Sequence, residues 1–229
     1  MQFGGLQKLS LIDYPEKVAA IVFTQGCLFR CRYCHNPELI PTSTQNIVSQ
    51  EEVLAYISFK KDFLDGVCIT GGEPTLHADL PDFIKKVKAL GLLVKLDTSG
   101  VNPGMVESLL RDGLVDYLAM DIKHRWESYN DIVQTANQQR IDNCKKTMRL
   151  IQESGIDHEF RTTVLPESHT AEDFISIAKQ LLPGEKYFIQ NISFAKNLDN
   201  TIDKSKQLDV SAIVDILKKS FPQVQIEQR

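Results

Sequence analysis

Short apolar runs alternate with amphipathic segments along most of the chain. Val18–Thr24, Gly66–Thr70 and Leu92–Leu96 are nearly continuous apolar runs, which are typical of strands buried on both faces. Ser49 and Glu52 have the spacing of a capping box, which predicts the start of a helix. The same reasoning predicts further strands at Val115–Met120, His158–Leu165, Lys186–Ile192 and Val224–Ile226, and helices at Ser49–Phe59, Leu80–Leu90, Pro103–Arg111, Arg140–Ser154, Ala171–Leu182 and Val210–Ser220.

This alternation predicts an α/β fold with a parallel sheet and right-handed crossovers. About six β/α units fall short of the eight that close a barrel, so we expect an open, partial parallel β/α barrel. We expect a single domain over residues 1–229, in which residues 1–17 form an N-terminal extension that packs on the barrel. In such folds the chemistry gathers at the carboxyl ends of the strands.

Composition and charge exclude several classes of protein. The formal net charge of −4 gives no electrostatic footprint for nucleic acid. No stretch approaches the roughly 20 apolar residues that cross a membrane, and the first residues do not resemble a secretory signal. Three of the five cysteines lie within eight residues, unlike a secreted disulfide framework. We therefore expect a cytoplasmic protein without nucleic-acid or membrane partners.

The three clustered cysteines predict a metal site. Cys27, Cys31 and Cys34 have the spacing C-x3-C-x2-C on a loop that directly follows a predicted strand. Soft thiolate ligands select zinc, copper(I) or an iron–sulfur cluster. His35 is the obvious fourth ligand for zinc, but it adjoins Cys34, whereas structural zinc sites leave at least two residues between ligands. A non-catalytic zinc-binding interaction module remains an alternative at this point.

The other two cysteines fit poorly as a fourth ligand. Cys68 lies within an apolar strand and Cys144 within a predicted helix, so both are expected to be buried structural thiols. Iron–sulfur clusters normally have four cysteine ligands, so three cysteines suggest a cluster with one iron open to an external ligand. The histidines show no spacing that requires a metal, and we expect solvated or capping roles for them; they include His77, His124, His158 and His169.

Polar or glycine-rich residues follow the successive predicted strands. Two adjacent glycines allow close approach of the backbone to a ligand, and free backbone groups can bind the charged ends of a zwitterion. Acids at strand ends can accept hydrogen bonds from ribose or hold a cation, although each one alone can equally be a helix cap or a surface ion pair. The candidate binding residues are Gly71, Gly72, Glu73 and Pro74, then Asp97, Thr98 and Ser99, then Asp121 and Lys123, and Arg161 on the fifth strand.

The cysteine spacing, with Tyr33 as the aromatic residue before the last cysteine, resembles the motif of the radical SAM superfamily, and Gly71–Pro74 resembles its GGEP segment. The resemblance implies a 4Fe–4S cluster on Cys27, Cys31 and Cys34, with S-adenosylmethionine on the fourth iron. It associates the Gly71–Pro74 segment with the methionine amino group, and Tyr33 with the same cofactor.

Three further segments resemble the glycyl radical enzyme activases of that superfamily. They are Cys34–Pro37 (CHNP), Asp97–Gly100 (DTSG) and Asp121–Lys123 (DIK). The resemblance implies roles in cofactor binding, with a monovalent cation near Asp97 and Asp121. The opening Gly5–Pro15 is most similar to activating proteins of anaerobic ribonucleoside-triphosphate reductase, except that Glu16 stands where the pattern usually has glycine.

The implied activity is a radical transfer to a protein. A flavodoxin or ferredoxin reduces the cluster, S-adenosylmethionine is cleaved, and the 5′-deoxyadenosyl radical takes a hydrogen atom from a glycine of the partner enzyme. The cofactors supply the chemistry, so no side-chain acid or base is nominated. A small-molecule radical SAM enzyme of deazapurine or nucleoside chemistry is the alternative, and the CHNP segment favours the activase.

Overall fold

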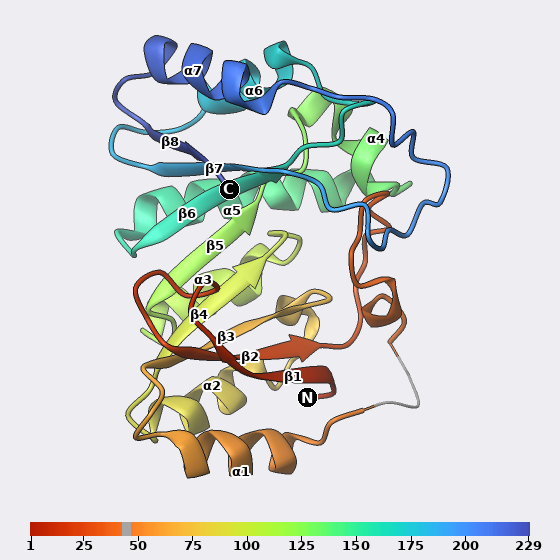
Figure 1. Ribbon diagram of the computed structural model, residues 1–229. Coiled ribbons are helices and arrows are strands. Elements are labelled where there is room, and N and C mark those ends of the chain that lie inside the picture. The colour runs from red at the N-terminus through yellow and green to blue at the C-terminus, as the bar shows by residue number, and fades with distance from the viewer. Residues whose placement is uncertain (43–46) are drawn as a thin grey trace. The chain divides into compact units, whose positions relative to one another are not determined.

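The computed structural model describes residues 1–42 and 47–229 (Figure 1). The chain divides into two compact units. The first unit comprises Met1–Leu28, Glu38–Ala119 and Asn143–Asp157, and the second comprises Phe29–Pro37, Met120–Asp142 and His158–Arg229. Strand β5 (Tyr117–Asp121) and helix α5 (Gln138–Ser154) each begin in one unit and end in the other. The prediction of a single domain stays a prediction.

The first unit contains a sheet in which the strands follow chain order. β2 (Ala19–Thr24), β3 (Gly66–Gly71) and β4 (Leu93–Thr98) are parallel, and β1 (Phe3–Ser10) pairs antiparallel with β2 at the edge. The helices α1 (Gln50–Lys60) and α2 (Leu80–Lys88) lie side by side, and α3 (Pro103–Arg111) follows β4 (Figure 1).

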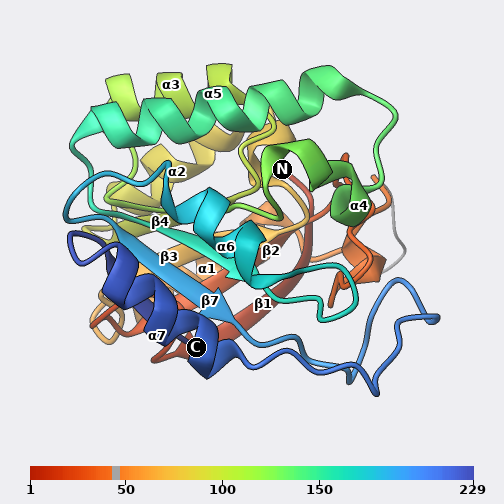
Figure 2. The ribbon, with the colours of Figure 1, turned by 90° about the horizontal axis from the view of Figure 1, so that it is seen from above.

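The second unit is built in the same way. β6 (His158–Thr163), β7 (Lys186–Gln190) and β8 (Gln225–Gln228) are parallel and in chain order. α7 (Val210–Ser220) packs on β8, and α6 (Ala171–Ala178) packs on α7 (Figures 1 and 2). The helices of this unit are α4 (Tyr129–Val133), α6 (Ala171–Ala178) and α7 (Val210–Ser220), and short 3-10 turns occur at Pro37–Leu39, Pro74–Leu76 and Trp126–Ser128.

Local sequence signals explain most of these elements. Ser49 accepts a hydrogen bond from the Glu52 amide and the Glu52 carboxylate accepts one from the Ser49 amide, so the predicted capping box starts α1. The middle of β3, Val67–Ile69, is fully buried, as the continuous apolar run predicted. The α/β fold with a parallel sheet is confirmed, and the chain-order strands are compatible with an open β/α barrel.

β1 and α4 were not predicted from the sequence. β1 lies within residues 1–17, which were expected only to pack on the barrel, and its sequence FGGLQKLS lacks a regular apolar alternation. An edge strand needs fewer apolar residues than a central one, because part of it faces water. α4 is only five residues long, too short for a periodic signal. Within the described residues, no helix combines the length and the apolar composition that a membrane span requires.

Candidate functional site

The cysteine loop begins where β2 ends. Gly26 has a φ of +100°, a left-handed conformation that glycine adopts without strain. The Gly26 amide donates to the Leu39 carbonyl at 2.7 Å and the Cys27 amide to the Ile40 carbonyl at 3.0 Å. These bonds fix the backbone of Cys27 within the first unit.

Cys31 and Cys34 are held by the second unit. The Cys34 amide donates to the Cys31 carbonyl at 2.9 Å, which closes a turn between the two cysteines. On one side of the loop, Arg30 and Arg32 amides donate to carbonyls of α4; on the other, the Leu198 amide donates to the Cys34 carbonyl at 3.1 Å. Cys31 is buried and Cys34 half-buried, and neither is in a disulfide. Backbone hydrogen bonds therefore fix this loop on both sides of the two cysteines.

Arg32 ties the same loop to two distant segments. Its guanidinium donates to Asp199 at 2.8 Å, to the Ser168 hydroxyl at 3.3 Å and to Glu167. Hydrogen bonds from the Thr201 hydroxyl and amide lower the pKa of Asp199 to about 2, and Arg32 makes a smaller contribution in the same direction. Sequence reasoning missed this cluster, because Glu167 and Asp199 lie 135 and 167 residues from Arg32 along the chain.

Tyr33 offers a buried hydroxyl to this part of the site. The residue is 4% exposed, and its hydroxyl has no hydrogen-bond partner among the described residues. The Lys123 ammonium lies 6.0 Å from the centre of its ring. Burial raises the pKa of Tyr33 far above its ordinary value, so the hydroxyl is a neutral donor. A buried donor without a partner is costly, and a bound ligand would satisfy it.

The three clustered cysteines are chemically suited to an iron–sulfur cluster. Among the described residues, no three His, Cys, Asp or Glu side chains are grouped so that they could hold one metal ion. In a cluster each cysteine binds its own iron, so the sulfur atoms need not converge on one point. None of the five cysteines is in a disulfide, and Cys68 and Cys144 are fully buried as predicted. The donor set therefore fits the cluster, with Cys27, Cys31 and Cys34 as its predicted ligands.

Gly71 and Gly72 are required by packing within the first unit. Gly71 has a φ of +110°, and a Cβ atom there would lie 2.4 Å from the Thr24 amide nitrogen. A Cβ atom on Gly72 would lie 2.2 Å from the Gly26 carbonyl oxygen. The two glycines thus let this loop approach the backbone that leads to Cys27. The close approach of this backbone to a ligand stays a prediction. Packing within the first unit is a separate reason why these two positions need glycine.

Glu73 has an internal role that the sequence did not indicate. Its side chain is 1% exposed, and its carboxylate accepts hydrogen bonds from Thr75 and from the next loop. The Thr98 hydroxyl donates at 2.7 Å, the Ser99 amide at 2.7 Å, and the Ser99 hydroxyl also donates. Glu73, Thr98 and Ser99 therefore tie the loops after β3 and β4 together. Pro74 is buried at the first position of the 3-10 turn.

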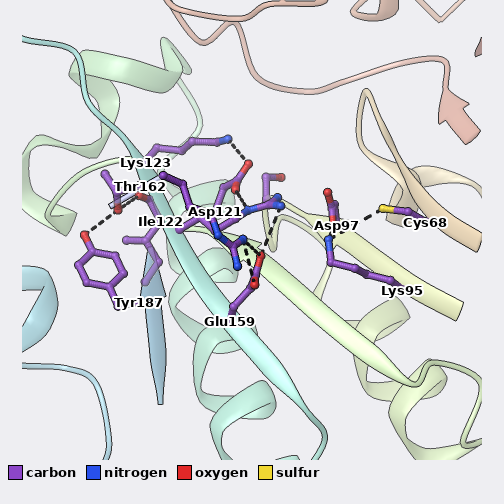
Figure 3. A network of polar contacts seen from close by, with 12 residues as sticks. Cys68, Lys95, Asp97, Asp121, Ile122, Lys123, Glu159, Thr162 and Tyr187 are labelled. Atoms are coloured by element: carbon purple, nitrogen blue, oxygen red, sulfur yellow. Dashed lines mark hydrogen bonds and ion pairs between the residues drawn. The ribbon is translucent and has the colours of Figure 1, made fainter. Parts of the chain in front are cut away.

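Asp97 has a cationic partner from its own strand. Lys95, two residues earlier on the same face of β4, pairs with the Asp97 carboxylate, and its side chain is only 2% exposed. The Lys95 ammonium also lies 3.9 Å from the Cys68 sulfur (Figure 3). It lies 6.0 Å from the centre of the Tyr117 ring. A lysine within the apolar run LVKL was a signal that sequence analysis did not use.

Asp121 is paired with two cations in the second unit. The Lys123 ammonium lies 2.8 Å from one carboxylate oxygen (Figure 3). The Arg161 Nε atom lies 2.8 Å from the other. Burial alone would raise the pKa of Asp121, but Arg161 and Lys123 hold it well below its usual range. Burial likewise acts to lower the pKa of Lys123, which Asp121, Tyr33 and Cys31 nevertheless raise well above its usual value. The predicted residues Asp121, Lys123 and Arg161 thus lie together.

A pair of buried histidines supports this group. His124 and His169 stack with ring centres 4.5 Å apart, and both are nearly inaccessible, contrary to the expected solvated or capping roles. His169 accepts from the Leu165 amide at 2.9 Å and lies 3.1 Å from the Lys123 carbonyl. Burial, then His124, lowers the pKa of His169 to about 4, so the ring is neutral near pH 7.

Comparison with known proteins agrees with these features. The model of the radical SAM superfamily matches residues 21–181, and the chain therefore belongs to this superfamily of enzymes, which implies a 4Fe–4S cluster and S-adenosylmethionine as cofactors. Within the superfamily it is 33% identical, over 97% of this chain and 94% of the relative, to a protein of Methanocaldococcus jannaschii named as a glycyl-radical enzyme activating enzyme.

Two further similarities cover about half of the other protein. The pyruvate formate-lyase-activating enzyme of Clostridium pasteurianum is 34% identical over 52% of this chain and 51% of that enzyme. The fold of SuiB from Streptococcus suis, in a crystal structure with S-adenosylmethionine, covers 91% of this chain and 49% of SuiB with a TM-score of 0.70 at 15% identity. The second similarity supports the fold alone.

Proposed function

We propose that the chain holds a 4Fe–4S cluster on Cys27, Cys31 and Cys34 and generates a glycyl radical on a partner enzyme. One observation carries the proposal: the C-x3-C-x2-C-H-N-P segment directly follows β2, in a chain 33% identical over nearly its whole length to a protein named as a glycyl-radical enzyme activating enzyme. The cluster and S-adenosylmethionine, when bound, supply the one-electron chemistry that removes a hydrogen atom from a glycine Cα of the partner.

The residues of this chain bind and orient. The backbone after β3, shaped by Gly71 and Gly72 and fastened by Glu73, is assigned to the methionine end of the cofactor. Because the Glu73 carboxylate already accepts its hydrogen bonds from Thr75, Thr98 and Ser99, its contribution is to hold the loop. The Tyr33 hydroxyl supplies a neutral donor, whereas Lys123 supplies positive charge.

We propose an anaerobic ribonucleoside-triphosphate reductase as the partner enzyme. The opening segment Gly5–Pro15 supports this choice over other glycyl radical enzymes. An external one-electron donor is required, and a flavodoxin or ferredoxin has the suitable chemistry. Asp97, Asp121 and Arg161 are further proposed cofactor-binding residues, each carboxylate being paired with a cationic side chain of its own unit.

The test is anaerobic reconstitution with iron and sulfide, followed by dithionite and S-adenosylmethionine. We expect about four irons per chain, formation of 5′-deoxyadenosine, and a glycyl radical doublet in electron paramagnetic resonance when the partner reductase is added. Cys31→Ala should lose both the cluster and the cleavage. Cys144→Ala is the matched control, because that thiol is fully buried in α5 and should leave both intact.

Each alternative gives a different result. One zinc per chain without iron would overturn the cluster and restore the zinc-binding interaction module. Cleavage of S-adenosylmethionine without a doublet on any glycyl radical enzyme would overturn the activase in favour of small-molecule radical chemistry. A doublet on pyruvate formate-lyase but not on the reductase would change only the partner.

A further inference from the structure

The charges beside Asp97 and Asp121 disagree with the monovalent cation that was expected there. Alkali cations bind oxygen ligands, and a carboxylate attracts one most strongly when no other positive charge is in contact with it. Both carboxylates instead contact cationic side chains of their own unit.

At Asp97 the positive charge is built into the strand. Lys95 lies on the same face of β4, and its side chain is almost inaccessible to solvent. The aliphatic part of the Lys95 side chain is already ordered by its burial. The ion pair with Asp97 therefore costs little additional side-chain entropy. The neighbouring groups, the Cys68 sulfur and the Tyr117 ring, are ones that tolerate or attract a cation. A second positive ion at Asp97 would lie within a few ångströms of the Lys95 ammonium and be repelled by it.

At Asp121 both oxygen atoms are occupied. One accepts from Lys123 and the other from the Arg161 guanidinium, each at 2.8 Å. Two positive charges thus face one carboxylate. Glu159, 3.8 Å from Arg161, is a further counter-charge, but it also pairs with Arg229 at 3.1 Å. These cationic side chains already outnumber the carboxylates without an added ion.

We propose that Lys95 at Asp97, and Lys123 with Arg161 at Asp121, take the place of the monovalent cation, so that neither carboxylate needs an alkali ion. Lys95 is then a positioning residue, because it acts by fixing the Asp97 carboxylate. The location within a cofactor site rests on the proposed function, whereas the charge balance does not.

The test compares melting temperatures of the cofactor-free protein in sodium, potassium and choline chloride at equal ionic strength. The wild-type protein should melt within about 1 °C in all three salts, and should not broaden the ²³Na resonance beyond the effect of its general surface charge. In Lys95→Met the Asp97 carboxylate loses its partner. Sodium or potassium should then raise the melting temperature by roughly 2 °C or more over choline.

The matched control is Lys88→Met, which removes a lysine 2.8 Å from Asp116 in the same unit. Asp116 still accepts from the Val94 amide and is more exposed than Asp97, so no difference between the three salts is expected. If Lys95→Met does not fold, the ²³Na measurement on the wild-type protein decides alone. A saturable sodium or potassium effect on the wild-type protein, or a folded Lys95→Met with no more cation dependence than wild type, would overturn the inference.

The reconstituted protein gives a second readout. Cleavage of S-adenosylmethionine by the wild-type protein should vary less than twofold among the three salts, and cleavage by Lys95→Met should depend on sodium or potassium. No cleavage under any condition would count against the proposed function, but the melting experiment would still decide whether a cation is needed.

Discussion

Two motif carboxylates in this molecule are stabilised in opposite ways. Glu73, in the first unit, is almost inaccessible and accepts hydrogen bonds from hydroxyl and amide donors of Thr75, Thr98 and Ser99. Asp121, in the second unit, is 28% exposed and contacts two cationic side chains. The first carboxylate ties two loops together, whereas the second holds charge in balance.

The contrast separates what each acid can do for a ligand. A carboxylate whose lone pairs are taken by internal donors stabilises the shape of a loop, and its loss leaves those donors unsatisfied. A carboxylate between two cations sets the local potential, and its loss leaves positive charge that a ligand anion can use. Sequence motifs alone do not distinguish these roles.

The largest expected effect is at Glu73. Glu73→Ala removes the acceptor of the Thr75 and Ser99 amides and of three hydroxyl groups, so we expect a loss of about 4 kcal/mol in the free energy of unfolding. Glu73→Gln keeps one oxygen but places an amide donor against other donors, and should cost about 2 kcal/mol. Urea unfolding measures both free-energy losses. A loss below about 1 kcal/mol for Glu73→Ala would mean that Glu73 does not stabilise the two loops that it connects.

Acid should weaken the second unit next. The folded-state pKa of His169 is about 4, below the unfolded value of 6.5, so the unfolded chain binds its proton first. Its contribution to stability is complete above pH 6.5 and is lost as the pH falls from 6.5 to 4. The loss is about 3 kcal/mol, from roughly 1.4 kcal/mol for each pH unit.

His169→Gln is the control, because an amide can accept from the Leu165 amide and donate to the Lys123 carbonyl without titrating. Urea unfolding of both proteins between pH 7 and pH 4 should show a steeper decline for the wild type. Parallel curves would mean that the buried histidines do not couple the Lys123 region to pH.

Asp121→Asn should have a smaller effect. The ion pairs with Lys123 and Arg161 are partly exposed, so the wild type should be more stable than the variant by about 1 kcal/mol at pH 7. Because the folded-state pKa of Asp121 lies below its unfolded value of 3.8, this advantage is present above pH 3.8 and is lost as the pH falls further. Urea midpoints of the two proteins that converge below pH 4 would agree with this assignment. An advantage that persists at pH 2 would mean that the ion pairs are not its source.

Local signals predicted most of the fold. The Ser49–Glu52 capping box and the apolar runs involve residues that are neighbours in sequence, and the structure confirms both. The three candidate cysteines stood out for the same reason. The two elements that were missed, β1 and α4, lack a regular apolar pattern because one is an edge strand and the other a single short turn of helix.

The contacts that define the candidate site were less predictable. Glu73 is 25 residues from Thr98, and no local rule states that a motif acid will be satisfied by the next loop. The partners of Arg32 are more than 100 residues away. The Lys95 contact could have been predicted, because a charged side chain within an apolar strand is energetically costly unless it is paired. Such a residue should be read as a sign of a buried partner.

The smallest expected effect lies outside both carboxylate centres. Glu16, in the turn between β1 and β2, has a φ of +61°, a conformation that strains residues with a Cβ atom. Glu16→Gly relieves about 1 kcal/mol of strain but makes the unfolded chain more flexible, so the net gain should be about 0.5 kcal/mol. Gln134→Gly, with a φ of +50° at the end of α4, is the matched change in the second unit. Equal gains in urea midpoint would show that backbone strain is independent of how each unit stabilises its carboxylate. A lower urea midpoint for Glu16→Gly alone would instead mean that the Glu16 side chain stabilises the turn by more than the strain costs.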